Sequence, residues 1–547
     1  MVLLGGKIWT GEPMAVGVSR PPLAECAQAV AIASGRILAV GTEAEIRPYV
    51  AKNTQVIDLA GRLAVPGFID SHVHFLEGGF QLGEVNLKDA DNEAEFITRI
   101  AAKAAQLPSG RWMLGGNWDE SSWPGQKLPS RWMIDPITPH HPVFLRRSDG
   151  HAALANSLAL KMAGISQDTF DPAGGAIVRD PCRGEPTGAL KDNAQELVSR
   201  IIPPPSLAEA IAALQAGLAE AARVGVTSVH NMNLGSRSPD GTFLGAFNLL
   251  SRTRAAGWLT CRFYEIVPIL EWRRLLSDGT ACAEPDDFIQ YGAVKAFADG
   301  SLGSRTAWMD EPYADDPSNT GLPTPIMDDP RKLESLCRGV ERDGLQLAVH
   351  AIGTRACHEI LSLYEAIGGP SVRARRFRIE HAQHLRPEDF ARFGRLGAIA
   401  SMQPYHAMDD GRWAEKRLGA ARARWSYAWR SMLDSGVPLA FGSDWPVAPL
   451  NPLLGLYAAV TRATLDASQP NGWFPEERIT LDEALRAYTA GGAFAAFHER
   501  EKGTIAPGKL ADIAVLSDDL FSIPPEKIKD ACAVMTLVGG KMIYPTK

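Results

Sequence analysis

A stretch of twelve residues that ends in two histidines constrains the fold of this chain more than any other. Residues 64–75 read AVPGFIDSHVHF, and the apolar run around Pro66 and Gly67 predicts a buried strand. Because side chains of a strand alternate between its two faces, His72 and His74 point the same way, about 6.5 Å apart along the backbone. This arrangement suits two ligands of one metal ion, although histidines near a strand end are also common as polar residues that face solvent.

The overall composition is that of a soluble globular enzyme. The chain has 547 residues, of which 45% are hydrophobic and 22% charged, which is ordinary for globular proteins. Its net charge of -7 and its mixed Lys and Arg distribution offer no basic face for nucleic acid. The seven scattered cysteines include no Cys-x-x-Cys pair, which indicates reduced thiols. With no cationic leader and no membrane-spanning apolar run, we expect a cytoplasmic protein that binds neither nucleic acid nor membrane.

Apolar, β-rich runs alternate with helix-like segments through the middle of the chain. There are eight such runs, at residues 68–74, 226–232, 262–266, 292–297, 345–350, 377–381, 398–402 and 438–441. This alternation is typical of a parallel sheet, and eight strands favour a closed (β/α)₈ barrel of the TIM type. We therefore predict an α/β fold built around such a barrel.

Two further domains are predicted beside the barrel. Short strands with glycine turns occur at both ends of the chain and predict a small β-sandwich built from residues 1–66 and 496–547. The barrel would then comprise residues 67–76 and 206–495. Residues 77–205 are too many for one βα loop, so they predict an inserted α/β domain after the first barrel strand, close to the substrate.

Four more candidate metal ligands end predicted barrel strands: Lys295, His350, His381 and Asp444. In a barrel of this kind the chemistry lies at the carboxyl ends of the strands. Taken singly, each residue has an ordinary structural explanation, such as a hydrogen-bonded histidine or an aspartate that forms a turn. Independent accidents would not place ligand-type residues at the ends of five of the eight strands, so together they predict a metal centre.

The motifs around these residues resemble those of the amidohydrolase superfamily, in its YtcJ-like branch that includes N-substituted formamide deformylases. The resemblance covers nearly the whole chain, including the terminal stretch 503–516. The motifs that carry it are PGFIDSHVH at 66–74, Lys295 followed by DGSLGSRT at 299–306, HAIG at 350–353, EHAQ at 380–383 and GSDWP at 442–446.

The resemblance implies one or two divalent metal ions, commonly zinc. His72 and His74 would bind the more buried ion together with Asp444, and a second pair, His350 and His381, would bind the other ion. Lys295, carboxylated by carbon dioxide, would bridge the two, because an unmodified ammonium cannot ligate a cation. The alternative is a salt-bridging Lys295 and a mononuclear site. The same ligands also accept manganese, iron or cobalt.

The expected reaction is hydrolysis of a small-molecule amide of the formamide, N-acyl or cyclic type, hence of a non-peptide carbon–nitrogen bond. A metal-bound hydroxide would attack the carbonyl carbon, and Asp444 would act as general base and then general acid. Ester or lactone hydrolysis at the same site stays open, and a metal-dependent decarboxylase is a more distant alternative. A non-catalytic binding protein is disfavoured because the ligand set is complete.

Several residues outside the ligand set are candidates for contact with the substrate. His151 follows the strand of the inserted domain and is predicted to be catalytic, as a donor to the developing oxyanion, or else to pack between domains. Arg305 either binds an anionic group of the substrate or anchors its own loop to Asp299 or Asp310. An aromatic wall for an apolar or aryl substituent would come from Trp118, Trp123, Trp308 and Trp445. Weaker candidates for substrate contact, after the seventh strand, are Tyr405 and His406. Single tryptophans are more often core residues, so only the group carries weight. The sandwich and the inserted domain each offer a surface for a homodimer.

Overall fold

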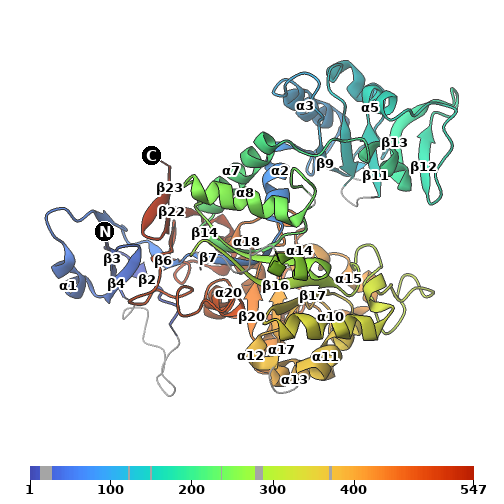
Figure 1. The fold of residues 1–547 in the computed structure, drawn as a ribbon. Helices are drawn as coiled ribbons and strands as arrows, with labels where there is room; N and C mark the ends of the chain where they lie inside the picture. Colours follow the sequence, from blue (N-terminus) through green and yellow to red (C-terminus); the bar gives the residue numbers. More distant parts are fainter. Residues whose placement is uncertain are drawn as a thin grey trace. The chain divides into compact units, whose positions relative to one another are not determined.

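The computed structural model describes residues 1–12, 27–120, 123–147, 151–235, 237–277, 287–368 and 372–546. The chain divides into two compact units (Figure 1): Met1–Phe75, Leu218–Ser236 and Thr242–Lys547 form the first, and Leu76–Gly217 and Arg237–Gly241 form the second. Two of the seven cysteines, Cys26 and Cys282, lie outside the described residues. The five described cysteines are free.

An eight-stranded parallel sheet forms the centre of the first unit, with the order β20-β19-β18-β17-β16-β15-β14-β7. Its strands are β7 (Phe68–Val73), β14 (Val226–Met232), β15 (Arg262–Pro268), β16 (Ile289–Phe297), β17 (Gln346–Ala351), β18 (Arg378–His381), β19 (Ile399–Met402) and β20 (Leu439–Phe441). A parallel bridge between Val73 and Trp445 brings the first strand beside the segment that follows the last. The predicted TIM-type barrel is therefore confirmed.

The first barrel strand, β7, is buried at every one of its positions. Strands of a parallel sheet are covered on both faces, which explains why even its polar residues Asp70, Ser71 and His72 are buried. The backbone of β7 lies very close to the segment that follows the last strand, since a Cβ on Gly442 would lie only 2.6 Å from the backbone nitrogen of His72. Asp70 reinforces this junction by accepting hydrogen bonds from the backbone N–H of Ser443 and of His72 at 2.9 and 3.1 Å.

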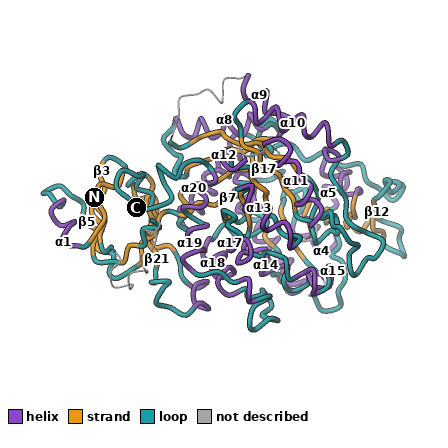
Figure 2. Tube along the Cα trace, turned by 90° about the horizontal axis from the view of Figure 1, so that it is seen from below, coloured by secondary structure: helices purple, strands orange, loops and turns teal. Residues whose placement is uncertain are grey.

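Helices surround the barrel strands, as Figure 2 shows by colour. They are α8 (Phe243–Ala255), α9 (Trp272–Ser277), α10 (Pro330–Arg342), α11 (Thr354–Gly368), α12 (Val372–Arg375), α13 (Pro387–Leu396), α14 (Pro404–Asp410), α15 (Ala414–Leu418), α16 (Ala420–Ala423), α17 (Trp429–Asp434), α18 (Pro452–Thr461), α19 (Leu481–Ala487) and α20 (Ala490–Ala495). In the described ranges, no helix has both the length and the apolar character needed to cross a membrane.

Helix α10 illustrates how the sequence specifies these helices. Asp329 caps its first turn by accepting hydrogen bonds from two backbone N–H groups, and Pro330 occupies the first helical position, where no N–H is needed. Leu333, Cys337 and Val340 follow at helical spacing and are buried. The polar remainder of the helix faces solvent.

The two ends of the chain build a sandwich of two sheets, with strand orders β4-β3-β1-β5 and β2-β6-β21-β22-β23. Strand β6 (Leu63–Pro66) pairs antiparallel with β21 (Ile513–Leu516), so the composite sandwich predicted from the sequence is confirmed. The other elements are β1 (Val2–Leu4), β2 (Lys7–Ile8), β3 (Ala29–Ala33), β4 (Arg36–Gly41), α1 (Glu43–Ile46), β5 (Val56–Asp58), β22 (Ala533–Val538) and β23 (Lys541–Tyr544).

The second unit contains a mixed six-stranded sheet with the order β12-β13-β11-β10-β9-β8. Its strands are β8 (Val85–Asn86), β9 (Gly115–Trp118), β10 (Phe144–Arg147), β11 (Ala152–Ala155), β12 (Gly175–Arg179) and β13 (Pro186–Asp192). Its helices are α2 (Phe75–Gly83), α3 (Glu93–Ala104), α4 (Arg131–Ile134), α5 (Ser157–Met162), α6 (Glu196–Ser199) and α7 (Leu207–Arg223), of which the first and last continue into the first unit. The sequence predicted this insertion over 77–205.

A buried ion pair connects the barrel to the sandwich. The Arg262 guanidinium on β15 donates from Nε and Nη2 to the two oxygens of Asp512 at 2.7 and 3.0 Å, and both side chains are almost completely buried. We expect Asp512→Ala to lower the free energy of unfolding of the first unit by about 3–5 kcal/mol, because it leaves a buried cation without its partner. The shift of the thermal unfolding midpoint measures this effect.

The matched control replaces both partners, in the double variant Arg262→Met with Asp512→Leu. It removes the charge and its partner together and should recover most of the lost stability. An Asp512→Ala protein that unfolds at the wild-type temperature would contradict a structural role for the pair.

Candidate metal centre

A cavity of about 390 Å³ opens at the carboxyl ends of the barrel strands. The structure brings all six predicted ligands together in its lining: His72, His74, Lys295, His350, His381 and Asp444. They come from β7, β16, β17 and β18 and from the segments that follow β7 and β20. Residues separated by hundreds of positions in the sequence thus share one concave surface.

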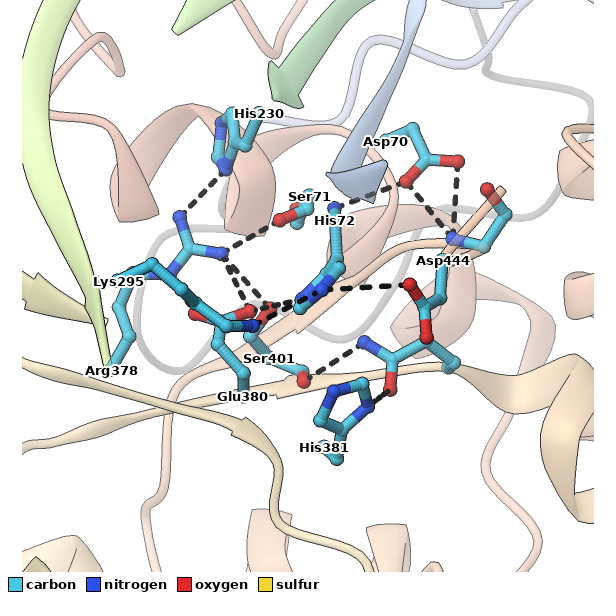
Figure 3. A network of polar contacts seen from close by, with 12 residues as sticks. Asp70, Ser71, His72, His230, Lys295, Arg378, Glu380, His381, Ser401 and Asp444 are labelled. Carbon is cyan, nitrogen blue, oxygen red and sulfur yellow. Dashed lines mark hydrogen bonds and ion pairs between the residues drawn. The ribbon is translucent and has the colours of Figure 1, made fainter. Parts of the chain in front are cut away.

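The hydrogen bonds of His72 determine which of its ring nitrogens can hold a metal. Its Nδ1 lies 2.6 Å from Glu380 Oε2 (Figure 3). Because a carboxylate only accepts, Nδ1 carries the proton and Nε2 keeps its lone pair. Burial lowers the pKa of His72 to about 4, which favours the neutral ligand form. Nε2 lies 3.6 Å from Asp444 Oδ1 and 3.4 Å from Lys295 Nζ.

Hydrogen bonds also fix the tautomers of His350 and His381. His350 donates from Nε2 to the Gly300 carbonyl at 3.0 Å, so its lone pair is on Nδ1. His381 lies with Nδ1 2.7 Å from Gln403 Oε1, and the Gln403 amide donates to the Ser401 carbonyl, which fixes its orientation. The His381 lone pair is therefore on Nε2. Burial lowers the pKa of both imidazoles, that of His350 to about 3.

Asp444 has a buried carboxylate oxygen that could bind a metal ion. Its Oδ1 is buried and has no hydrogen-bond partner among the described residues, and it lies 3.4 Å from His74 Nε2. Burial alone would raise its pKa, but the neighbouring imidazoles, His72 first, hold the pKa well below its usual value. Ligand atoms of His72, His74 and Asp444 all lie within 4.8 Å of one another. This donor set of nitrogen and carboxylate fits a divalent transition metal.

A second group of possible metal ligands consists of His381, His406 and Asp444, whose ligand atoms also lie within 4.8 Å of one another. The sequence analysis had ranked His406 only as a weaker candidate. Two of the candidate ligands also have strained backbones, with φ of +74° at His381 and +59° at Asp444. Non-glycine residues in this region cost about 1–3 kcal/mol each and occur preferentially at functional sites. The strain adds to the indications that these strand ends serve a function.

Lys295 is buried in β16, and its Nζ points into this ligand set. Burial lowers the pKa of Lys295 to about 8, although the negative charges of Glu380 and Asp444 act in the opposite direction. An ammonium at this position would repel a cation held by His72, so a metal requires the amine to be neutral or converted into an anion.

Comparisons with known proteins agree with this geometry. A family model described as the amidohydrolase family matches residues 55–544. The chain belongs to this amidohydrolase family. Its relatives include Protein LONG AFTER FAR-RED 3 of Arabidopsis thaliana, 42% identical over 100% of this chain and 91% of that protein. The N-substituted formamide deformylase of Arthrobacter pascens is 29% identical over 95% of each chain.

A solved structure of similar fold is also that of a metal-dependent hydrolase. The crystal structure of an uncharacterized metal-dependent hydrolase from Pyrococcus horikoshii superimposes with a TM-score of 0.77 at 26% identity, over 96% of this chain and 98% of that chain. The resemblance inferred from the motifs is thus confirmed, and this amidohydrolase is a metal-dependent hydrolase.

Two of the tryptophans predicted for the substrate wall of the amidohydrolase lie in the core of the second unit. Trp118 and Trp123 are buried among apolar side chains. Their indole N–H groups donate to the backbone carbonyls of Leu145 and Ala90 at 3.1 and 2.7 Å. Both tryptophans are therefore core residues, which was the alternative to a place in the substrate pocket.

The other two tryptophans predicted for the substrate wall, Trp308 and Trp445, lie in the first unit. Trp445 is almost fully buried and packs edge to face against Phe75, with ring centroids 5.6 Å apart. Trp308 is partly exposed, and the Arg355 guanidinium lies 4.8 Å from the centre of its ring. Contact of these two residues with a substrate stays a prediction.

Arg305 is anchored within its own loop, but its predicted partners were wrong. Its guanidinium donates to the two oxygens of Asp315 at 3.1 and 2.9 Å. Asp299 instead accepts hydrogen bonds from the backbone N–H groups of residues 308, 352 and 353, and Asp310 pairs with Arg386. The alternative prediction was that the Arg305 guanidinium binds an anionic group of the substrate, but this guanidinium is already paired with Asp315.

His151 belongs to the second unit of the amidohydrolase. Its side chain is exposed, and Nδ1 lies 2.9 Å from Asp192 Oδ1. Its contact with the substrate stays a prediction.

Two buried charges beside the candidate metal ligands were not predicted from the sequence. Arg378 donates from Nε to Glu380 Oε1 at 2.8 Å and from Nη1 to His230 Nδ1 at 2.9 Å, and both charged side chains are completely buried. Burial would raise the pKa of Glu380, but the Arg378 charge and the hydrogen bond from His72 hold it well below its usual value. Arg378 and Glu380 lie two positions apart in a buried strand, and this pattern in the sequence could have indicated a buried ion pair.

We expect Glu380→Gln to weaken metal binding about 10–100-fold, because the carboxylate sets the tautomer and orientation of His72. Titration of the metal-free protein against a competing chelator measures the affinity directly. Glu334→Gln is the matched control, since Glu334 pairs with Arg338 on the surface and should bind metal like the wild type. Unchanged affinity in Glu380→Gln would contradict the orienting role.

Proposed function

We propose that this protein hydrolyses an amide-type carbon–nitrogen bond of a small molecule, of the formamide, N-acyl or cyclic amide class. The observation that carries the proposal is the cavity in which four imidazoles, Lys295 and Asp444 converge. The N-substituted formamide deformylase of Arthrobacter pascens, which is similar in sequence over 95% of each chain, supports an amide over other carbonyl substrates.

The residues present fit two divalent ions, and imidazole and carboxylate groups are common ligands of zinc. His72, His74 and Asp444 would hold the first ion, and His350 and His381 the second, with Lys295 as a carboxylated bridge. When bound, such ions supply Lewis acidity, which acidifies water and polarises a carbonyl group.

Asp444 has the proton-transfer role in this proposal. Within the predicted ligand set it is the one carboxylate, and its buried Oδ1 faces the cavity residues His72 and His74. Oδ1 would accept the proton of the attacking water and deliver it to the leaving nitrogen, as general base and then general acid. Burial lowers the pKa of His72, His350 and His381, so these neutral imidazoles do not repel the cations.

A panel of formamides, N-acyl amino acids, cyclic amides and aryl esters, assayed with the zinc-loaded protein, tests the proposal. We expect turnover of at least one amide class, and none by the same protein after chelation. Turnover confined to esters or lactones would replace the amide assignment, and loss of carbon dioxide from a carboxylic acid would indicate a decarboxylase. No turnover of any carbonyl compound at full metal occupancy would refute hydrolysis of these classes.

A further inference from the structure

One wall of the cavity carries a carboxylate that the proposed hydrolysis does not use. Asp410 is the last residue of α14 and lines the same cavity as the candidate metal ligands. Gln383 Nε2 and Tyr427 OH both donate to its Oδ2, at 2.6 and 2.7 Å. These two bonds hold the carboxylate in one orientation, while Oδ1 accepts no hydrogen bond from the described part of the chain.

No cation compensates this carboxylate within the described ranges. Asp410 forms no ion pair there, and burial raises its pKa to about 7, which the hydrogen bond from Tyr427 counteracts only in part. The end of α14 adds the partial negative charge of a helix carboxyl terminus. A carboxylate removed from water without a counter-ion is unfavourable unless a cation reaches it.

The neighbouring charges are already paired with other groups. Asp409, the preceding residue and also part of the cavity lining, pairs with Arg412. Arg417 on α15 pairs with Asp315. Asp410 therefore differs from Asp409 in having no cationic partner among the described residues.

The lining next to Asp410 is aromatic. Tyr405, Trp413 and Tyr427 contribute to the wall of the cavity, and Phe297 lines it as well. Aromatic faces accommodate apolar groups, and their negative electrostatic potential tolerates an adjacent organic cation. A carboxylate beside such rings is the environment that recognises a positively charged nitrogen attached to an apolar group.

We propose that Asp410 is a specificity-determining residue that receives a positively charged nitrogen of the substrate through Oδ1. The substrates are then amides that carry an ammonium or quaternary ammonium group on an aryl or alkyl substituent. This inference rests on the proposed function for the bond that is cleaved, but cation binding is measured without turnover, so the two can fail separately.

The test uses benzyltrimethylammonium as the probe and the zinc-loaded protein as the receptor. This cation cannot ligate a metal, so its binding reports the Asp410 wall, and benzyl alcohol serves as the neutral aromatic comparison. Isothermal titration calorimetry should show that the wild type binds the cation more tightly than the alcohol. Equal affinity for the two probes in the wild type would overturn the proposal without any variant.

The decisive variant is Asp410→Asn, which keeps an oxygen acceptor for Gln383 and Tyr427 and removes the charge. We expect it to weaken binding of the cation about tenfold while benzyl alcohol binds as before. Asp409→Asn is the matched control from the same wall and should bind both probes like the wild type. Unchanged cation affinity in Asp410→Asn, or an equal loss in Asp409→Asn, would overturn the assignment.

Discussion

Asp444→Asn is expected to lower the turnover number about 10³-fold, because the amide cannot accept the proton of the attacking water. Asparagine is the appropriate replacement, since it keeps the size of the side chain and also adopts the left-handed backbone that Asp444 has, with φ of +59°. Single-turnover and steady-state rates on the best substrate of the panel measure the effect.

Metal content must be measured on the same preparation, because Asp444 is also a proposed ligand. A variant that is reloaded to wild-type metal content and stays inactive has lost the proton transfer itself. Asp409→Asn is the control, since Asp409 lines the same cavity and is paired with Arg412, and its turnover should be unchanged. Near-normal turnover of Asp444→Asn would remove Asp444 as the proton shuttle.

The barrel could be predicted from the sequence because of how a parallel sheet is covered. Its strands are buried on both faces, so most of them contain a short apolar run, such as LAV at 347–349 in β17, and the runs recur at the spacing of βα units. The composite sandwich was also predictable, since short strands with glycine turns occur at both ends of the chain. The sequence pattern contains less information about where one compact unit ends and the next begins, because α7 belongs partly to each.

The candidate ligands were predictable for a related reason. Ligand-type residues at the ends of parallel strands must meet at one edge of the barrel, whatever their separation in sequence. Their protonation could not be predicted in this way. His72 and Glu380 are 308 residues apart, so the hydrogen bond that frees His72 Nε2 is visible only in the folded chain. Gln403 and Gly300 fix the tautomers of His381 and His350 through contacts that span 22 and 50 residues.

Substrate-side residues were the least predictable part of the site. A tryptophan in a core and one in a pocket have the same local sequence signature, and Trp118 illustrates this, since only the fold shows that it is completely buried. The partner of Arg305 depended on competition among three nearby aspartates. Asp299 is occupied by backbone N–H groups and Asp310 by Arg386, which leaves Asp315 for the guanidinium.

Lys295→Ala is expected to lower the metal content of the protein towards about one equivalent per chain. The lysine lies among the proposed ligands, with Nζ 3.4 Å from His72 Nε2, and a carboxylated side chain there would place an anion between the two histidine pairs. Removing it leaves His72, His74 and Asp444 to hold a single ion and deprives the second site of its anionic ligand. Elemental analysis of the purified, zinc-reconstituted protein measures the stoichiometry.

Rescue distinguishes a bridging role from general damage to the fold. Formate, acetate or propionate can enter the space left by the shortened side chain and supply the missing carboxylate, so metal content and turnover should rise together when these acids are added. Lys502→Ala is the matched control, because Lys502 is another buried lysine of the first unit, donates to Ser228 and lies outside the ligand set. It should retain the wild-type stoichiometry. Unchanged metal content in Lys295→Ala would contradict the bridge and leave a centre built from the histidines and Asp444 alone.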